Sequence, residues 1–268
     1  MANLYFPQLS SGALAQYPIQ KVRIVPTVKN VMLDGNMLLY ADLNANPGAS
    51  RMIWELSYAG LGQVDLQALQ SHFEACLGPL RAFTFIDPTN NMLVSSEDFT
   101  NSCWQTGAMQ VTAEVADPAG GMQGTVLTNT SQASQQIVQT LAVPANYQYC
   151  LSAYVLSAQA TSIVLTRSGS TASDATSFTV GPSWTRVVSS GRLNDAGTTF
   201  TAGILLAPGQ QVTIYGMQLE AQQQPSGYRR TGQEGGVYPG AHWATDELAI
   251  TATAPDVFST SFSIETSL

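Results

Sequence analysis

The pattern of hydrophobic and polar residues divides the chain into three stretches. In the first, apolar and β-branched residues recur from Tyr17 to Tyr40 at strand spacing, with Asp34-Gly35 as a turn between them. This pattern predicts a β-hairpin. After a loop around Asn46-Pro47-Gly48, apolar residues at 52, 54 and 56 alternate with residues 51, 53 and 55, which predicts a strand with one buried face.

A helix is expected next, with Asp65 as its N-cap and Gly78 just past its end. Its apolar residues recur at helical spacing on one face: Leu66, Leu69, Phe73, Cys76 and Leu77. His72 on this helix is expected to be a partly exposed residue rather than a ligand, because no second His, Cys or carboxylate is spaced to join it.

The first stretch closes with a short strand at residues 83–86 and a turn at residues 87–91. Its helix and strands together supply enough large apolar side chains for a small core. We expect that core to consist of Trp54, Leu69, Phe73, Phe83 and Phe85.

No helical periodicity survives in the second stretch, from about Phe99 to Gly227. Short runs rich in Thr, Val, Leu, Ile and Tyr are separated by turn residues every 8–15 positions, which is typical of an antiparallel sandwich. In one of them, alternation places Tyr147, Tyr149, Leu151, Ala153 and Val155 on one face. The predicted strands are 111–115, 124–129, 134–141, 147–156, 162–167, 176–180, 185–191, 198–206 and 211–220.

The last forty residues contain two more predicted strands, 247–253 and 258–265, bracketed by Gly235-Gly236, Pro239-Gly240 and Pro255. Two strands cannot stand alone in water, so they must join the sheet of the first stretch. The expected organisation is therefore a mainly β chain with a discontinuous small α+β domain, residues 1–93 and 229–268. A β-sandwich, residues 94–228, is inserted into it.

Composition and charge exclude several classes of partner. Only 10% of residues are charged, against about 25% in an ordinary soluble domain. The net charge is −8 with 10 Lys and Arg in all, which argues against nucleic-acid binding. No apolar run approaches the ~20 residues that span a bilayer, so membrane insertion is not expected.

The N-terminus lacks the pattern of a signal peptide. The three cysteines fit neither a metal site nor a disulfide framework. We therefore expect synthesis in a reducing cytoplasm.

Catalysis has little support in the sequence. Glycan cleavage needs two carboxylates facing each other, and the acids of the second stretch lie mostly in predicted loops with no marked pair. A serine nucleophile needs a histidine, and the chain has only His72 and His242. Gly120-Gly121 and Gly235-Gly236 are turns without the strand–loop–helix setting of a phosphate site. We expect no enzyme and no cofactor.

Sugar binding would use aromatic rings together with polar side chains. Among the aromatic residues of the second stretch, Tyr149 and Trp184 are expected in the core, and Trp104 and Tyr154 are the candidate carbohydrate contacts. Glu97 and Asp98, at the start of the sandwich, are candidate ligands of a structural Ca²⁺, although such a site needs six or more oxygens.

Two parts of the chain resemble known families. "SRMIWELSYAGLGQVDLQALQSHFEACLGPLRAFTFIDPTNN" (50–91), with the closing residues 229–268, resembles the small tail-tip domain of the distal tail and minor tail proteins of long-tailed phages, which also occurs in gene transfer agents. "VPANYQYCLSAYVLS", "FTVGPSWTRVV" and "GMQLEAQQQPSGYRRT" resemble carbohydrate-binding β-sandwiches attached to phage tail proteins, in which a Gln-Leu-Glu strand precedes a Pro-Ser-x-Tyr segment. The second resemblance implies a jelly-roll fold.

These resemblances imply a structural protein of a bacteriophage tail tip or baseplate. The small domain would form a homo-oligomeric ring, which the family resemblance implies to be a hexamer. The ring would lie next to the tail tube and other tail-tip proteins in the virion. The jelly roll would face a host cell-surface glycan. The alternative is a stand-alone carbohydrate-binding protein or adhesin, and a ring in solution would distinguish the two.

Overall fold

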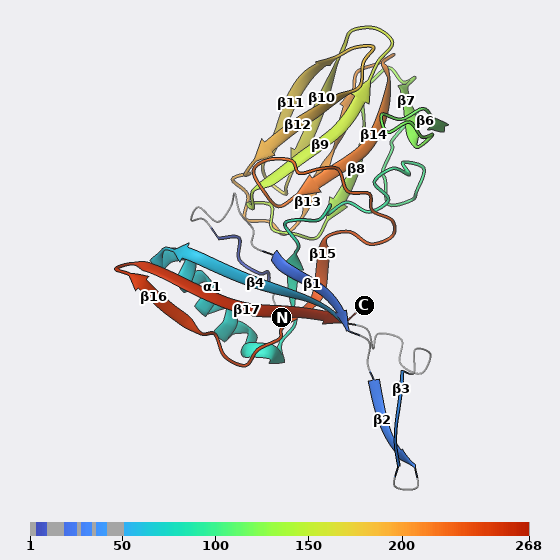
Figure 1. Cartoon of the computed structure of the whole chain (residues 1–268). Coiled ribbons are helices and arrows are strands. Elements are labelled where there is room, and N and C mark those ends of the chain that lie inside the picture. The colour runs from blue at the N-terminus through green and yellow to red at the C-terminus, as the bar shows by residue number, and fades with distance from the viewer. Residues whose placement is uncertain (1–3, 10–18, 26–27, 34–35, 42–50, 268) are drawn as a thin grey trace. The chain divides into compact units, whose positions relative to one another are not determined.

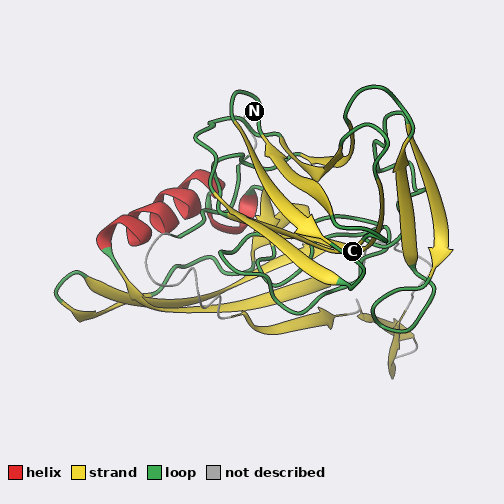
Figure 2. Ribbon diagram, turned by 90° about the horizontal axis from the view of Figure 1, so that it is seen from above, coloured by secondary structure: helices red, strands yellow, loops and turns green. Residues whose placement is uncertain are grey.

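The computed structural model describes residues 4–9, 19–25, 28–33, 36–41 and 51–267. They form two compact units, unit 1 (Met1–Phe85 with Tyr238–Leu268) and unit 2 (Ile86–Val237). Apart from one α-helix and a short 3-10 turn, the regular elements of the described residues are strands (Figures 1 and 2). The predicted mainly β fold class is confirmed. The predicted turn at Asp34-Gly35 and loop at Asn46-Pro47-Gly48 lie outside the described residues.

Unit 1 is built on an antiparallel sheet whose members come from both ends of the chain. The order is β1 (Ile19–Val25), β4 (Arg51–Leu61), β17 (Val257–Ser267), β15 (Val237–Trp243) and β5 (Phe83–Ile86), with β16 (Ile250–Ala254) paired to β17. In the long β4–β17 pairing, Ile264 lies opposite Trp54 and Phe262 opposite Leu56. The C-terminal strand therefore pairs within unit 1. A separate hairpin consists of β2 (Val28–Leu33) and β3 (Asn36–Ala41).

An aromatic core lies between this sheet and the helix α1 (Gln63–Cys76). Trp54, Leu69, Phe83 and Phe85 are buried there as predicted. Phe73 is only half-buried: its ring meets Trp243 edge-on, with centroids 5.1 Å apart. It packs against the edge of the predicted core, because the innermost helix positions are occupied by other side chains. The core also contains Phe6, Trp243 and Phe262, which the sequence did not indicate.

The N-terminal end of α1 and the position of His72 differ from the prediction, whereas Gly78 lies just past the helix end as predicted. The N-cap is Gly62 rather than Asp65, and Leu77 (φ 54°) ends the helix in the left-handed conformation, before the 3-10 turn η2 (Gly78–Leu80). His72 is buried, and its Nδ1 accepts a hydrogen bond from Trp243 Nε1 at 3.2 Å. The expected exposure of His72 was wrong, because Trp243, far away in the sequence, supplies the hydrogen bond that its buried ring needs.

Unit 2 is a sandwich of two antiparallel sheets. One has the order β11 (Ser173–Val180), β10 (Thr161–Ser168), β13 (Phe200–Leu206), β8 (Gln135–Leu141). The other has the order β12 (Thr185–Gly191), β9 (Tyr149–Leu156), β14 (Gln211–Glu220), β7 (Gly124–Asn129), β6 (Met109–Val115). Every predicted strand of this stretch is present, and the bounds of β7, β12 and β14 match those predicted.

The core of the sandwich follows the predicted alternation. Tyr149, Leu151, Ala153 and Val155 are buried in it, and Tyr147 packs against it. Met92 and Leu93 also belong to this core, so the expected boundary at 93/94 falls inside unit 2. Trp184, expected in the core, lies just before β12 and is half-buried outside it. That expectation was wrong, because the inward positions of β12 are Val187 and Ser189.

Candidate functional site

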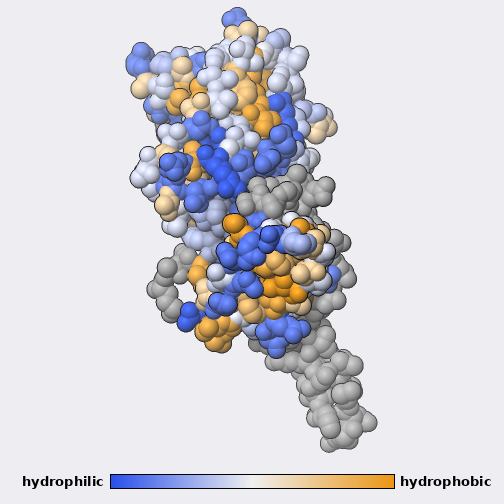
Figure 3. Space-filling view, turned by 90° about the vertical axis from the view of Figure 1, so that its left-hand side faces the viewer, coloured by the Kyte–Doolittle hydropathy of each residue, from blue (hydrophilic) through white to orange (hydrophobic). Residues whose placement is uncertain are grey.

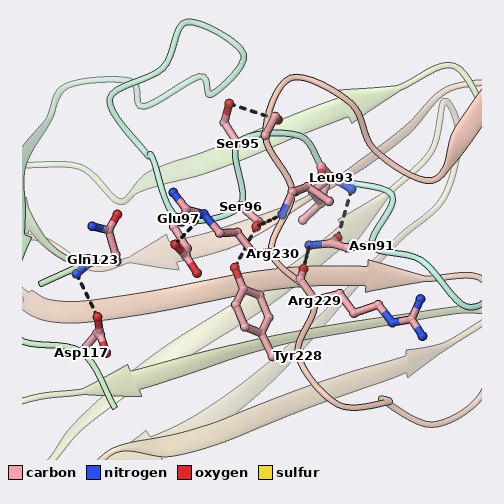
Figure 4. Close-up of polar contacts among 12 residues, drawn as sticks. Asn91, Leu93, Ser95, Ser96, Glu97, Asp117, Gln123, Tyr228, Arg229 and Arg230 are labelled. Carbon is pink, nitrogen blue, oxygen red and sulfur yellow. Dashed lines mark hydrogen bonds and ion pairs between the residues drawn. The ribbon is translucent and has the colours of Figure 1, made fainter. Parts of the chain in front are cut away.

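The two ends of unit 2 run side by side along the second half of β14. We call residues 91–97 the incoming segment and residues 222–232 the outgoing segment. The backbone of the incoming segment bonds to β14 through Met92 N to Leu219 O (2.8 Å) and Met217 N to Ser96 O (3.2 Å). The outgoing segment then bonds to the incoming one, Thr231 N donating to Ser96 Oγ at 2.9 Å (Figure 4). The unit therefore closes on itself where the chain enters and leaves it.

Tyr228 fastens the outgoing segment to the outer face of β14. Its ring lies 5.3 Å from that of Tyr215, and its hydroxyl is 2.7 Å from Ser96 Oγ (Figure 4). Gly216 (φ 61°) lies in a bulge where the β14–β9 register shifts, and a Cβ there would be 2.9 Å from the Tyr228 ring. Glycine is thus required twice, for its backbone conformation and for space. Burial raises the pKa of the Tyr228 phenol, so this group stays a neutral hydrogen-bonding partner.

Two buried side chains of β14 hold the rest of the outgoing segment. Glu220 accepts hydrogen bonds from the backbone and hydroxyl of Ser226 and from Gln222 Nε2. Gln218 accepts one from Arg229 N at 2.7 Å and donates one to Gly227 O at 3.4 Å. The Gln-Leu-Glu and Pro-Ser-x-Tyr residues, which carried the resemblance, therefore anchor the outgoing segment of the module.

Beyond this anchored region, the outer face of the five-stranded sheet carries a pair formed by Tyr154 and Arg186. The two residues are directly opposite each other on β9 and β12. The Arg186 guanidinium carbon lies 5.5 Å from the centre of the Tyr154 ring, within the range of a cation–π contact. Tyr154 is half-buried, and its ring centre lies 6.1 Å from that of Tyr215.

Arg186 is held rigidly in this position. One terminal nitrogen donates to Ser226 O at 2.6 Å and the other to Ser152 Oγ at 2.9 Å. A guanidinium has five N–H groups, so these two bonds leave the second N–H of each terminal nitrogen for another partner, whereas Nε is buried and has no hydrogen-bond partner within the described residues. The result is a preorganised aromatic and cationic face.

The two predicted sugar contacts have different surroundings. Tyr154 is part of this face. Trp104 is only 4% exposed; it packs against Phe99 and its Nε1 donates to Ser95 O at 3.0 Å. It therefore offers no ring face to a ligand. Arg186 was missed, because only the pairing of β12 with β9 places it beside Tyr154.

Two acids of unit 2, Asp195 and Asp117, hold loops in place through backbone amides. Asp195 accepts hydrogen bonds from the backbone amides of Thr171, Ala172 and Gly197. The bond from Thr171 is the main cause that lowers the pKa of Asp195 to about 2. Asp117 is bonded in the same way, with Gln123 N the main cause of its lowered pKa (Figure 4).

The two candidate calcium ligands also have partners. Glu97 pairs with Arg230 (3.1 Å), and Asp98 accepts from Thr100. Within the described ranges, no three His, Cys, Asp or Glu residues are grouped to hold a metal. The same ranges contain no helix with the length and hydrophobicity needed to cross a membrane.

No protein-family model and no curated protein matches the chain. Solved structures match in part. The C-terminal family 22 carbohydrate-binding module of Clostridium thermocellum Xyn10B is 17% identical, with a TM-score of 0.42 over 52% of this chain and 99% of the module. The xylan-binding domain of Paenibacillus barcinonensis Xyn10C has 17% identity and a TM-score of 0.41, over 50% of this chain and 96% of that domain.

A third match is to the enzymatically active domain of tailspike protein 4 of bacteriophage CBA120. The identity is 13% and the TM-score 0.40, over 51% of this chain. The match spans only 22% of that tailspike chain.

Proposed function

We propose that unit 2 is a non-catalytic glycan-binding module whose ligand face is centred on Tyr154 and Arg186. The observation that supports it is a partly exposed aromatic ring beside a cation that the fold holds in place. Sugars present apolar C–H faces that stack on aromatic rings, and hydroxyls that accept from guanidinium groups. Because Arg186 is already fixed by Ser226 and Ser152, little side-chain entropy is lost on binding.

A non-catalytic role agrees with the state of the acids. Asp117 and Asp195 are occupied by backbone amides, and Glu220 by the outgoing segment. Glycoside hydrolysis needs a pair of carboxyl groups free to face the scissile bond. The aromatic face has Arg186 and hydroxyl or amide neighbours instead.

The test is binding of the full chain to an array of neutral and acidic glycans. Tyr154→Ala removes the ring, whereas Tyr154→Phe removes only the hydroxyl and serves as the matched control. The proposal expects the alanine variant to lose at least tenfold in affinity and the phenylalanine variant to stay within about threefold, because stacking depends on the ring. Equal affinity of all three proteins would contradict it.

We further propose that unit 1 assembles into a ring, a hexamer in the resembled family, as a tail-tip or baseplate protein of a phage virion. The sequence resemblance of residues 50–91 and 229–268 supports this role. So does the exposure of large apolar side chains at both ends of α1, Val64 (73%), Leu77 (53%) and Leu80 (73%). Figure 3 shows apolar areas on the surface of the described residues. Contiguous apolar areas on a protein surface are typical of interfaces with another subunit.

The alternative is a stand-alone carbohydrate-binding protein. The observation that favours it is the closure of unit 2 by its own incoming and outgoing segments, since a self-closed module needs no host domain. Light scattering and electron microscopy of the purified chain distinguish the two proposals. A ring supports the tail-tip role, and a monomer at micromolar concentration supports the alternative.

A further inference from the structure

The outer face of the four-stranded sheet of unit 2 carries no charged residue. By alternation, the inward positions of its strands hold Ile137, Ile163, Leu165 and Phe200 together with the buried Arg167, whose partner Asp174 is partly exposed. The outward positions hold only small, hydroxyl, amide and aliphatic residues: Gln136, Val138, Thr140, Ser162, Val164, Thr166, Ser168, Ser173, Ala175, Ser177, Thr179, Thr201, Gly203 and Leu205. A face of this kind has no Coulombic preference for an ion.

A pocket of about 480 Å³ opens at the β8 side of this face. Val138 and Leu205 give it an apolar floor, and its other walls are polar: Gln105, Gly107, Ser134, Gln135 and Gln136. Gln105 comes from the loop before β6, which pairs with β8 through backbone bonds to Val138 (Gln105 N to Val138 O, 2.9 Å). The pocket is thus framed by a paired segment rather than by a free loop.

Glycine at two positions shapes this pocket. A Cβ at Gly203 would be 2.1 Å from the backbone oxygen of Ile137 and 2.5 Å from Val138 Cγ1, so glycine lets β13 lie this close to β8. Gly107 (φ 57°) leaves room for the Gln135 carboxamide, whose Oε1 would be 2.5 Å from a Cβ. That oxygen accepts from Ala108 N at 3.1 Å, which fixes the amide and leaves its NH₂ group for another partner.

The remaining amides of the pocket are available. Gln105 and Gln136 are exposed, and within the described part of the chain their side chains make no hydrogen bond. A carboxamide both donates and accepts, as a sugar hydroxyl does. Three carboxamides and a hydroxyl around an aliphatic floor match a ligand with an apolar ring face and a rim of hydroxyls.

We propose that this pocket is a second binding site of unit 2, for an uncharged oligosaccharide. It shares with the proposed function only the class of ligand, since it lies on the other sheet from Tyr154 and shares no residue with that face. Two sites in one module bind a polymeric glycan with higher avidity than either site alone.

The test is isothermal titration and NMR titration of the full chain with neutral hexasaccharides (cellohexaose, xylohexaose, maltohexaose and mannohexaose) and with hexagalacturonate. The pocket variant is Gln105→Ala with Gln136→Ala, and the matched control is Gln159→Ala, an exposed glutamine in the β9–β10 loop. We expect a neutral hexasaccharide to shift the amide signals of residues 134–138. The double variant should weaken that event at least tenfold, and Gln159→Ala should leave it unchanged.

The outcomes separate the two sites. If the double variant loses one binding event and Tyr154→Ala loses another, both sites are supported. If binding is lost only in the double variant, the pocket is supported and the Tyr154 face is overturned. A single event lost in Tyr154→Ala but unchanged in the double variant overturns the pocket and leaves the proposed function standing. If the pocket binds hexagalacturonate as tightly as a neutral hexasaccharide, its preference for uncharged ligands is overturned. If no probe binds, both sites are overturned.

Discussion

Replacing Gly216 with alanine should loosen the outgoing segment from the sheet. Two costs add at this position. The left-handed backbone (φ 61°) costs an alanine about 1–2 kcal/mol relative to glycine. The new Cβ would also stand 2.9 Å from two carbons of the Tyr228 ring, and overpacking of this kind costs about 1–3 kcal/mol. The expected loss in the free energy of unfolding is therefore about 2–5 kcal/mol.

Gly209 provides the matched control. It has a similar backbone conformation (φ 74°), and a Cβ there would have no heavy atom within 4 Å. Gly209→Ala thus keeps the backbone cost and omits the clash, so we expect a loss of about 1–2 kcal/mol. Urea unfolding of both variants measures the difference, with hydrogen exchange of residues 226–231 as a local readout.

Gly216→Ala should lose clearly more stability than Gly209→Ala. It should also speed hydrogen exchange in the outgoing segment. If the two variants lose the same amount and exchange there is unchanged, the ring of Tyr228 does not depend on Gly216. The role of the Tyr228 ring, packed on Gly216, in anchoring the outgoing segment would then be refuted.

Three further predictions concern unit 1 and the link between the units. Burial lowers the pKa of His72 from 6.5 to about 4, so below pH 6.5 the unfolded chain takes up a proton that the folded chain does not. The free energy of unfolding should fall by roughly 3 kcal/mol as the pH drops from 6.5 to 4, and His72→Gln, measured by urea unfolding across this range, should lack that part of the decrease. Phe73→Ala should cost about 1–2 kcal/mol, less than the 3–5 kcal/mol typical of a buried Phe, because its ring is only partly buried at the edge of the core; a larger loss in thermal unfolding would place it fully inside. Replacing residues 88–235 with a Gly/Ser linker should leave a folded, ring-forming unit 1 without glycan binding, and loss of rings in electron microscopy would show that unit 2 builds the interface.

Much of the sandwich was predictable because its strands follow local rules. The bounds of β7, β12 and β14 were found from β-branched runs between turn residues, and in β9 the inward set follows from simple alternation. These features depend on neighbours in sequence. Each sheet strand needs only a buried face and a turn at either end.

The errors come from contacts between residues far apart in sequence. β15 was missed because Pro239-Gly240 predicts a turn, yet both residues lie inside that strand. His72 is buried because Trp243, 171 residues away, donates to it. No local pattern contains such a partner.

The candidate site shows the same difference between features set by neighbouring residues and contacts between distant ones. Tyr154 could be named from the sequence as an aromatic residue on an outward strand position. Arg186 could not, because its place beside Tyr154 depends on the register of β12 against β9. The Gln-Leu-Glu residues illustrate the converse, since a recognisable motif proved to anchor the chain through Gln218 and Glu220.

The central claim is that unit 2 binds glycan on the outer face around Tyr154 and Arg186. The measurement that tests it most directly is an NMR titration of the full chain with the best glycan from the array, following the Arg186 side-chain Nε–H signal and the backbone amides of β9 and β12. We expect saturable shifts at residues 152–156 and 184–188 that vanish in Tyr154→Ala and persist in Tyr154→Phe. Saturable binding that leaves these signals unmoved, or that survives in Tyr154→Ala with the same affinity, would contradict it.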